Sequence, residues 1–148
     1  MRASIFAIVS SLVLTALCAT LSAQTLSSAS NYQVIVHPNN SAVTLDRRFA
    51  EDAFLKKITV WPDGVVIRPV DLAASSPVRR RFTEDILNRS VEAMKGYWQQ
   101  RIFSGRDVPP PELDTDDDVI AYVLKYEGAI GYVSGSANLR GAKALAVR

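Results

Sequence analysis

The sequence of 148 residues contains one cysteine, Cys18, and one histidine, His37. A disulfide needs two cysteines, and zinc sites draw their ligands from clusters of cysteine and histidine. We therefore expect no disulfide framework, no metal site and no catalysis through a thiol or an imidazole. The formal net charge is only +2, which provides no broad basic surface, so no nucleic-acid partner is expected.

Sequence signatures of catalysis are also missing. We find no pair of carboxylates at a motif spacing, no Ser–His constellation and no glycine-rich nucleotide loop. The acidic run Asp116-Asp117-Asp118 follows Thr115, and acidic residues in that position usually complement the dipole of a helix rather than bind a cation. The sequence thus predicts a protein that is not an enzyme and holds no cofactor.

Residues 1–23 differ from the rest of the chain. They contain Arg2, then an apolar stretch over residues 5–21, and end in Leu-Ser-Ala, a pattern typical of a cleaved secretory signal peptide. A membrane anchor is a poorer fit because a span needs about 20 strongly apolar residues. A lipoprotein is also a poorer fit, because Leu17 before Cys18 is not small.

Cleavage after Ala23 would remove 23 of the 148 residues and leave 125 without a cysteine. Small secreted domains of eukaryotes are usually rich in disulfides, so a bacterial periplasm is the better assignment. We expect a flexible leader over residues 24–31, which are small and polar, and one domain over residues 32–148.

The first half of this domain alternates between strand and helix patterns. Residues 32–37 form a β-branched run that Pro38 and two asparagines interrupt, which predicts a strand. Apolar residues at helical spacing over residues 45–54 predict a short helix capped by Thr44 or Ser41.

The sequence Trp-Pro-Asp-Gly at residues 61–64 predicts a turn, because proline presets φ and glycine tolerates a positive φ. Residues 65–70 should form the next strand. Ser76 is then the expected N-cap of a helix that has Pro77 in its first position. Its buried stripe should consist of Val78, Phe82 and Ile86. Its exposed side should carry Arg79, Arg80, Thr83 and Glu84.

The second half predicts two more helices. Ser90 can cap the first, whose apolar stripe ends at Ile102 and is followed by Gly105. Thr115 can cap the second, and strands should follow over residues 129–133 and 143–147. With strands and helices alternating, the fold class is α/β, with a mixed, mostly parallel sheet flanked by helices.

Four phrases of the sequence together resemble a known family. They are VIVHPNN at residues 34–40, FLKKITVWPDG at 54–64, VVIRPVDLAASSPVRRRF at 65–82 and GAIGYV at 128–133. The chain resembles the phosphate-binding subunits of bacterial ABC importers, which are type II periplasmic binding proteins, over about residues 32–134. The resemblance implies one lobe of a two-lobed binding protein, with the other lobe missing.

The resemblance also implies an oxyanion site at a helix N-terminus. Backbone N–H groups and a partial positive charge meet there, so Ser75 and Ser76 would donate hydroxyls and Arg79 would supply charge. The alternative is that Ser76 only caps the helix, while Arg79 and Arg80 lie in water and Arg80 faces Glu84.

The sequence departs from the family around the N-terminus of this helix. Pro77 stands in place of a glycine, Val78 in place of a threonine, and Leu72 where these binders carry an arginine. Losing a charge-assisted arginine contact costs on the order of 1.5–3 kcal/mol, which corresponds to about tenfold or more in affinity. We therefore expect weaker phosphate binding than in the family.

Two functions remain open from the sequence. The first is a periplasmic solute-binding-like protein that captures phosphate or a related oxyanion for uptake or sensing. The alternative is a ligand-free interaction module that docks on a membrane transporter, a porin or a sensor kinase. In either case a single lobe would expose the surface that its missing half should face, so a homo-dimer is an expected partner arrangement.

Overall fold

The structure, a computed structural model, describes residues 31–148. The predicted signal peptide and all but the last residue of the predicted leader lie outside the described residues. The central element is a five-stranded sheet with the strand order β2-β7-β1-β6-β3. The strands are β1 (Tyr32–Val36), β2 (Thr44–Leu45), β3 (Arg68–Pro69), β6 (Ala129–Ser134) and β7 (Lys143–Val147).

Both directions of strand pairing occur in the molecule. β1 pairs antiparallel with β6 and with β7, whereas β2 pairs parallel with β7 and β3 parallel with β6. A separate parallel pair joins β4 (Asp71–Leu72) to β5 (Glu112–Leu113). The α/β class with a mixed sheet is therefore confirmed, and the longest pairings in it are the antiparallel ones.

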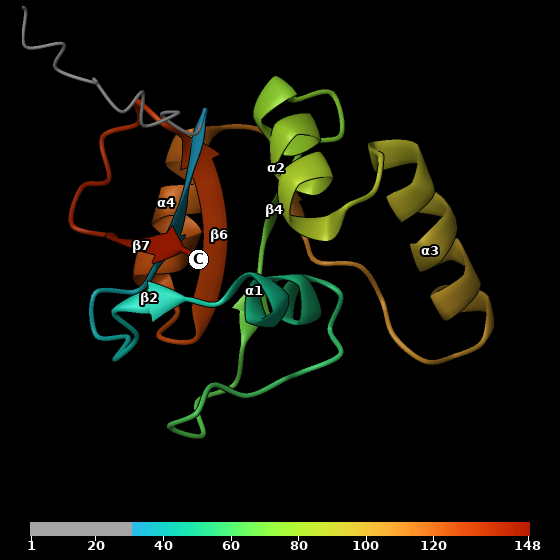
Figure 1. Cartoon of the computed structure of the whole chain (residues 1–148), viewed down its shortest axis with the longest axis horizontal. Coiled ribbons are helices and arrows are strands. Elements are labelled where there is room, and N and C mark those ends of the chain that lie inside the picture. The colour runs from blue at the N-terminus through green and yellow to red at the C-terminus, as the bar shows by residue number, and fades with distance from the viewer. Residues whose placement is uncertain (1–30) are drawn as a thin grey trace, which may run out of the picture.

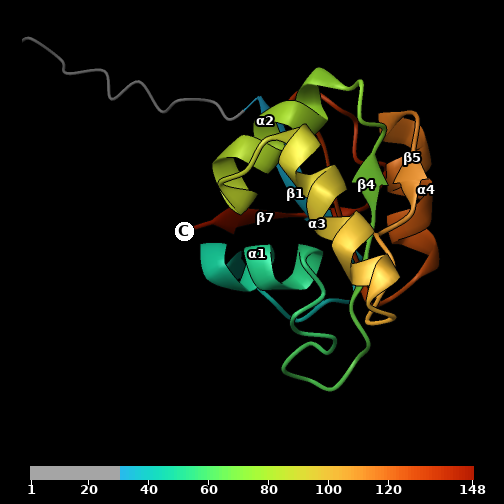
Figure 2. The same ribbon diagram turned by 90° about the vertical axis from the view of Figure 1, so that its right-hand side faces the viewer.

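Four helices surround the sheet in the described part of the chain. They are α1 (Arg47–Phe54), α2 (Pro77–Leu87), α3 (Val91–Phe103) and α4 (Asp116–Lys125). α4 covers one face of the sheet, and α1 and α2 cover the other (Figures 1 and 2). α3 lies farther out, next to α2. None of the helices in residues 31–148 has the length and apolar character that crossing a membrane requires.

The core has two parts, one on each face of the sheet, and alternate residues of β6 contribute to each. Side chains of successive strand residues point to opposite faces. A Cβ on Gly131 would lie 2.8 Å from Val119 of α4, so this residue faces α4 and leaves no room for a side chain. The ring of Tyr132 faces the other way and stacks on Phe82 of α2 with 3.8 Å between ring centroids. Phe54 of α1 packs against both rings.

The predicted turn at residues 61–64 is present. The Gly64 amide donates to the Trp61 carbonyl at 2.9 Å, and Gly64 has a φ of 87°. The Trp61 indole donates to the carbonyl oxygen of Gly128, which ties this turn to the start of β6. A Cβ on Gly128 would overlap the carbonyl oxygen of Val66, so only glycine allows this close approach.

Two predictions about the first half of the domain are wrong. α1 begins at Arg47 and is capped by Asp46, whose side chain accepts from the Arg48 and Phe49 amides. Neither Thr44 nor Ser41 is the cap, because residues 44 and 45 form β2. The strand expected over residues 65–70 is limited to Arg68–Pro69.

The exposed side predicted for α2 is also partly wrong. Arg79 and Thr83 are buried, together with Phe82 and Ile86. α2 packs against α1 and the sheet, and also against α3 and β4. A helix covered on several sides buries more than one stripe, which the every-fourth-residue spacing of apolar residues does not reveal.

Candidate anion-binding site

The candidate site lies where β4 passes into α2. Ser76 caps the helix as predicted, and its Oγ accepts from the Arg79 amide at 3.4 Å. The Ser76 amide donates back to the Ala73 carbonyl at 2.9 Å, which closes the loop before the helix. Ser75 is exposed beside it. The structure therefore places both predicted serines at the helix N-terminus.

The first turn of α2 retains an uncompensated positive end. It contains no acidic residue, and Pro77 in its first position has no N–H. The Val78 amide has no acceptor within residues 31–148. Because nothing in this turn neutralises the helix dipole, an anion close to the turn would be stabilised.

Arg79 occupies a different environment from the one expected of a surface residue. Its side chain is buried, with the residue only 4% exposed. Nη2 lies 3.2 Å from Oδ2 of Asp71, and Nη1 donates to the Leu72 carbonyl at 2.6 Å. Nη1 also lies 3.4 Å from Oε1 of Glu112. The guanidinium is thus bonded to β4 and β5, and its charge is already shared with two carboxylates.

Asp71 connects this arginine to the core. Its Oδ1 accepts from the Tyr132 hydroxyl at 2.6 Å. Burial, partly offset by the Arg79 guanidinium and the Tyr132 hydrogen bond, raises the pKa of the Asp71 carboxyl from 3.8 to about 6. Burial and the neighbouring carboxylate also raise the pKa of Tyr132, so its hydroxyl remains a donor. The buried pair therefore fixes where the Arg79 guanidinium lies.

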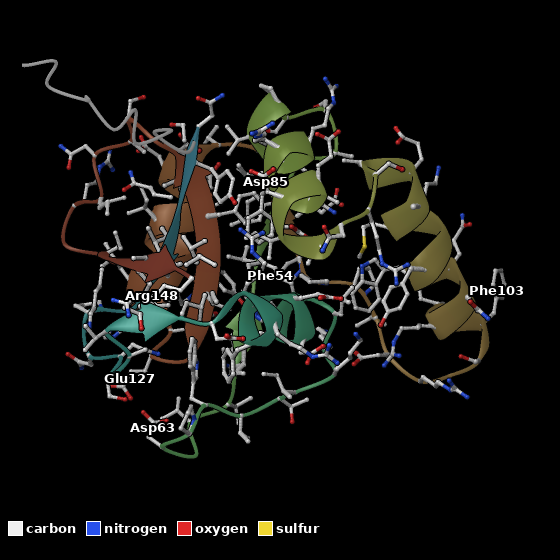
Figure 3. All side chains as sticks on the ribbon, viewed as in Figure 1. Phe54, Asp63, Asp85, Phe103, Glu127 and Arg148 are labelled. Atoms are coloured by element: carbon white, nitrogen blue, oxygen red, sulfur yellow. The ribbon has the colours of Figure 1, made fainter. Side chains whose placement is uncertain are left out.

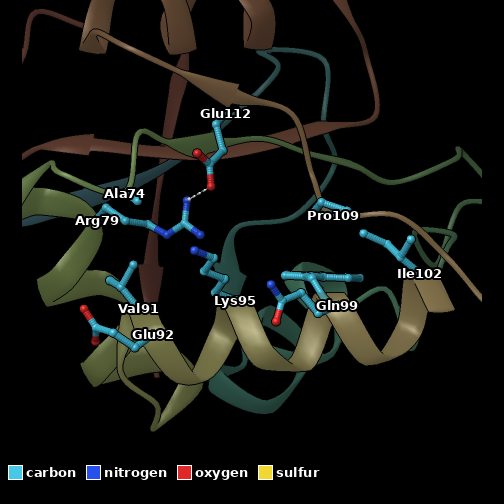
Figure 4. A pocket seen from close by; sticks show the side chains of 10 residues that line it. Ala74, Arg79, Val91, Glu92, Lys95, Gln99, Ile102, Pro109 and Glu112 are labelled. Atoms are coloured by element: carbon cyan, nitrogen blue, oxygen red, sulfur yellow. Dashed lines mark hydrogen bonds and ion pairs between the residues drawn. The ribbon is translucent and has the colours of Figure 1, made fainter.

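A cavity of about 560 Å³ opens beside the guanidinium, between α2, α3 and the segment that leads to β5 (Figure 4). Charged and polar side chains and an apolar wall line it together. The lining residues are Ala74, Arg79, Val91, Glu92, Lys95, Trp98, Gln99, Ile102, Pro109 and Glu112. Ser75 and Ser76 are not among them, but Ala74 joins the cavity to the loop that holds them.

Two cationic side chains meet in this cavity. Figure 4 shows the Lys95 ammonium, from α3, pointing toward the Arg79 guanidinium, with the Glu92 carboxylate turned away from both. Lys95 forms no ion pair with any described residue. Because Arg79 is already paired with Asp71 and Glu112, Lys95 is the cation of the two that has no carboxylate partner among the described residues, and an anion beside it would be stabilised.

Two residues that line the cavity also have side-chain donors without acceptors. Nε of Arg79 and Nε1 of Trp98 are buried and have no hydrogen-bond partner in the described part of the chain. Trp98 is only 5% exposed. A buried donor left unpaired costs free energy, so such atoms are rare in folded proteins.

The sequence did not point to most of the cavity. No motif contains Lys95, Gln99 or Glu112, and Trp98 falls on the apolar stripe of its helix, where packing is the commoner role and an aromatic binding platform the alternative. Glu112 is 33 residues from Arg79 and reaches it through the pairing of β5 with β4. A strand of two residues leaves no periodic pattern, so no sequence signal could have found this contact.

Within residues 31–148, no group of three or more histidine, cysteine, aspartate or glutamate side chains could hold a metal ion. Asp116 of the acidic run accepts from the amide and the hydroxyl of Ser134 on β6. This carboxylate therefore ties the start of α4 to the sheet.

No protein-family model and no curated protein sequence matches this chain. Solved structures do. A putative phosphate ABC transporter substrate-binding protein from Clostridium perfringens, solved with bound phosphate, is 24% identical with a TM-score of 0.62 over 79% of this chain and 44% of its own. An ABC-type phosphate transport receptor from Vibrio cholerae is 19% identical with a TM-score of 0.60, over 79% of this chain and 46% of its own.

PstS from Borrelia burgdorferi is 13% identical with a TM-score of 0.61, and the match covers 80% of this chain and 47% of that protein. The chain thus spans less than half of the length of these solved proteins. The predicted fold class is confirmed: residues 31–148 have the fold of one portion of a phosphate ABC transporter substrate-binding protein.

Proposed function

We propose that this chain is a solute-binding-like protein that binds phosphate or a related oxyanion where β4 meets α2. One observation carries the proposal. The fold is shared with phosphate receptors, and in this chain the α2 N-terminus, with no acidic residue in its first turn, adjoins a cavity containing Arg79 and Lys95. Its role is binding, not catalysis.

The donors expected to hold the oxyanion come from three elements. The exposed Ser75 hydroxyl and the Val78 amide face an anion at the helix end. Lys95 supplies a charge that no described carboxylate pairs with. Since Arg79 is already shared between Asp71 and Glu112, Lys95 is the residue best able to replace the arginine that the family carries at the position of Leu72.

Isothermal titration calorimetry of the mature protein with phosphate and with sulfate tests the proposal. Ser75→Ala removes a hydroxyl that caps no helix in the described structure, and Ser76→Asp keeps a good N-cap while placing a carboxylate at the site. We expect both variants to weaken binding, Ser76→Asp by at least about tenfold, which is 1.4 kcal/mol.

Ser136→Ala is the matched control. Ser136 is exposed in the connection between β6 and β7, away from the cavity lining, and its loss should leave the affinity unchanged. Thermal melting of each variant checks that α2 remains folded. Absence of binding heat at millimolar phosphate, sulfate and phenyl phosphate, or unchanged binding by Ser76→Asp, would refute the proposed function.

The proposal includes a compartment and partners. We infer export to the periplasm by a cleaved signal peptide, so that mass spectrometry of the secreted protein should show Gln24 as the first residue. A membrane transporter component or a sensor protein would receive the ligand-bound form. Light scattering tests the proposed homo-dimer, and a monomer at high concentration would count against it.

A further inference from the structure

We propose that the ligand of this site is a phosphate monoester with a compact apolar or aromatic group, rather than free phosphate. The phosphate would lie between Arg79 and Lys95 near the β4–α2 loop, and the apolar group would fill the rest of the cavity. This inference rests on the proposed function, because it names the class of ligand that the same site accepts.

The size of the cavity is the first argument. At about 560 Å³, it lies within the range of roughly 300–1,000 Å³ that is usual for sites of small organic ligands. An inorganic phosphate ion would occupy only the charged end and would leave the apolar wall wet. A ligand that fills the cavity must therefore carry an organic group.

The arrangement of the lining is the second argument. Figure 4 shows Arg79 and Lys95 toward the end that Ala74 and Glu112 border, whereas Ile102 and Pro109 lie at the other end. Trp98 adds apolar surface to the wall, while Val91 lies on the Arg79 side, where Glu112 pairs with one face of the guanidinium. A site with cations at one end and apolar side chains at the other is complementary to an anion that carries an apolar body.

The unpaired donors are the third argument. Arg79 and Trp98 both line the cavity, and each has a buried side-chain nitrogen, Nε and Nε1 respectively, with no acceptor among the described residues. A phosphate group offers several strong acceptor oxygens and forms charge-assisted hydrogen bonds with guanidinium and ammonium groups. Small side-chain movements would bring these donors to the ligand, and binding would then remove the cost of leaving them unpaired.

A direct test uses calorimetry with phenyl phosphate, inorganic phosphate, benzoate and phenol, with tryptophan fluorescence of a Trp61→Phe background, in which Trp98 remains, as a second readout. We expect phenyl phosphate to bind at least about tenfold more tightly than inorganic phosphate, since its ring removes apolar surface from water. Benzoate, with a smaller anionic head, and phenol, with none, should bind more weakly than phenyl phosphate.

Four variants separate the two halves of the ligand. Lys95→Gln should weaken both phenyl phosphate and phosphate by about tenfold, and Ile102→Ser should weaken phenyl phosphate alone. Ile102 is 49% exposed, so its replacement does not disturb the core. Lys125→Gln on α4 and Phe103→Ser, at the outer end of α3, make the same chemical changes outside the cavity and should alter neither affinity.

The outcomes distinguish this inference from the function on which it rests. If neither phosphate nor phenyl phosphate binds, both fail. If phosphate binds as tightly as phenyl phosphate, or if Ile102→Ser changes nothing, the function stands and the monoester is excluded. If benzoate or phenol equals phenyl phosphate, the cavity selects the ring and not the phosphate, and the inference is again overturned.

Discussion

The N-termini of α2 and α4 begin alike and then diverge. Ser76 caps α2 by accepting from the Arg79 amide, and Thr115 caps α4 by accepting from the Asp118 amide. The first turn of α4 then contains three aspartates, whereas that of α2 contains none. α4 therefore has its compensating anions built into the sequence, and α2 leaves its positive end for an external one.

The surroundings of the two helix N-termini also differ, since one is bonded to the sheet and the other lies beside a cavity. The start of α4 is tied to β6, because Asp116 accepts from the amide and the hydroxyl of Ser134. α2 has beside it the 560 Å³ cavity, on whose far side lies α3. α3 ends in Phe103, which is 90% exposed and points away from the molecule (Figure 3). The closed helix end is structural, and the open one is the candidate for binding.

The largest expected effect comes from breaking the buried pair beneath α2. Arg79→Met leaves Asp71 buried without its cation and should lower the free energy of unfolding by about 3–5 kcal/mol. Arg80→Met, on the exposed side of the same turn, should stay within about 0.5 kcal/mol of wild type. Urea unfolding measures both, and equal stability of the two variants would show that the pair does not hold the α2 end in place.

The pH dependence of stability should be next in size. The pKa of Asp71 is about 6 in the folded protein and 3.8 when unfolded, so the folded state binds a proton more tightly. This contribution is fully present below pH 3.8 and is lost as pH rises through 6, by up to about 3 kcal/mol. Asp71→Asn should lack this component. Equal slopes for the two proteins between pH 4 and 6, in urea unfolding, would contradict the assignment.

Removing either cap should have a smaller and similar effect on folding. Ser76→Ala and Thr115→Ala should each lower the free energy of unfolding by about 1 kcal/mol, because each leaves one first-turn amide without its acceptor. Only Ser76→Ala should also reduce the stabilisation that added phosphate gives, measured as the rise in melting temperature. If both caps alter the phosphate effect equally, the two helix ends do not differ as proposed.

The smallest effects should come from exchanging the charge patterns of the two ends. Asp117→Asn removes a first-turn charge from α4 and its exposed pair with Arg140, and should cost about 0.3–1 kcal/mol. Pro77→Glu gives α2 a built-in anion, four residues before Arg81, and should weaken phosphate binding while leaving α2 folded. Chemical unfolding measures the first effect and calorimetry the second. Undiminished phosphate affinity of Pro77→Glu would contradict the proposal that the N-terminus of α2 binds an anion.

The local features of the fold could be predicted because they are encoded by neighbours in sequence. Ser76, Ser90 and Thr115 all cap helices as predicted. The turn before Gly64 and the left-handed conformation of Gly105, with a φ of 65°, follow from the same kind of short-range chemistry. The resemblance in four ordered phrases then correctly indicated the fold of the solved phosphate-binding proteins.

The features that the sequence did not predict depend on contacts between residues far apart in the chain. Arg79 looks like a surface residue in sequence, but β4 and β5 bring Asp71 and Glu112 to it. Lys95 reaches the same cavity because α3 packs across α2. Neither contact leaves a periodic trace in the sequence. The serines and Arg79 could therefore be named from the sequence, whereas the burial of Arg79, its two carboxylate partners and the approach of Lys95 could not.

The central claim is that the end of α2 binds an oxyanion and the end of α4 does not. An NMR titration of the ¹⁵N-labelled mature protein with phosphate tests it directly, because each helix end reports through its own amides. We predict saturable shifts at Ser75, Val78 and Arg79, with the amides of residues 116–119 unmoved. Unmoved α2 amides, or equal shifts at both helix ends, would contradict the claim.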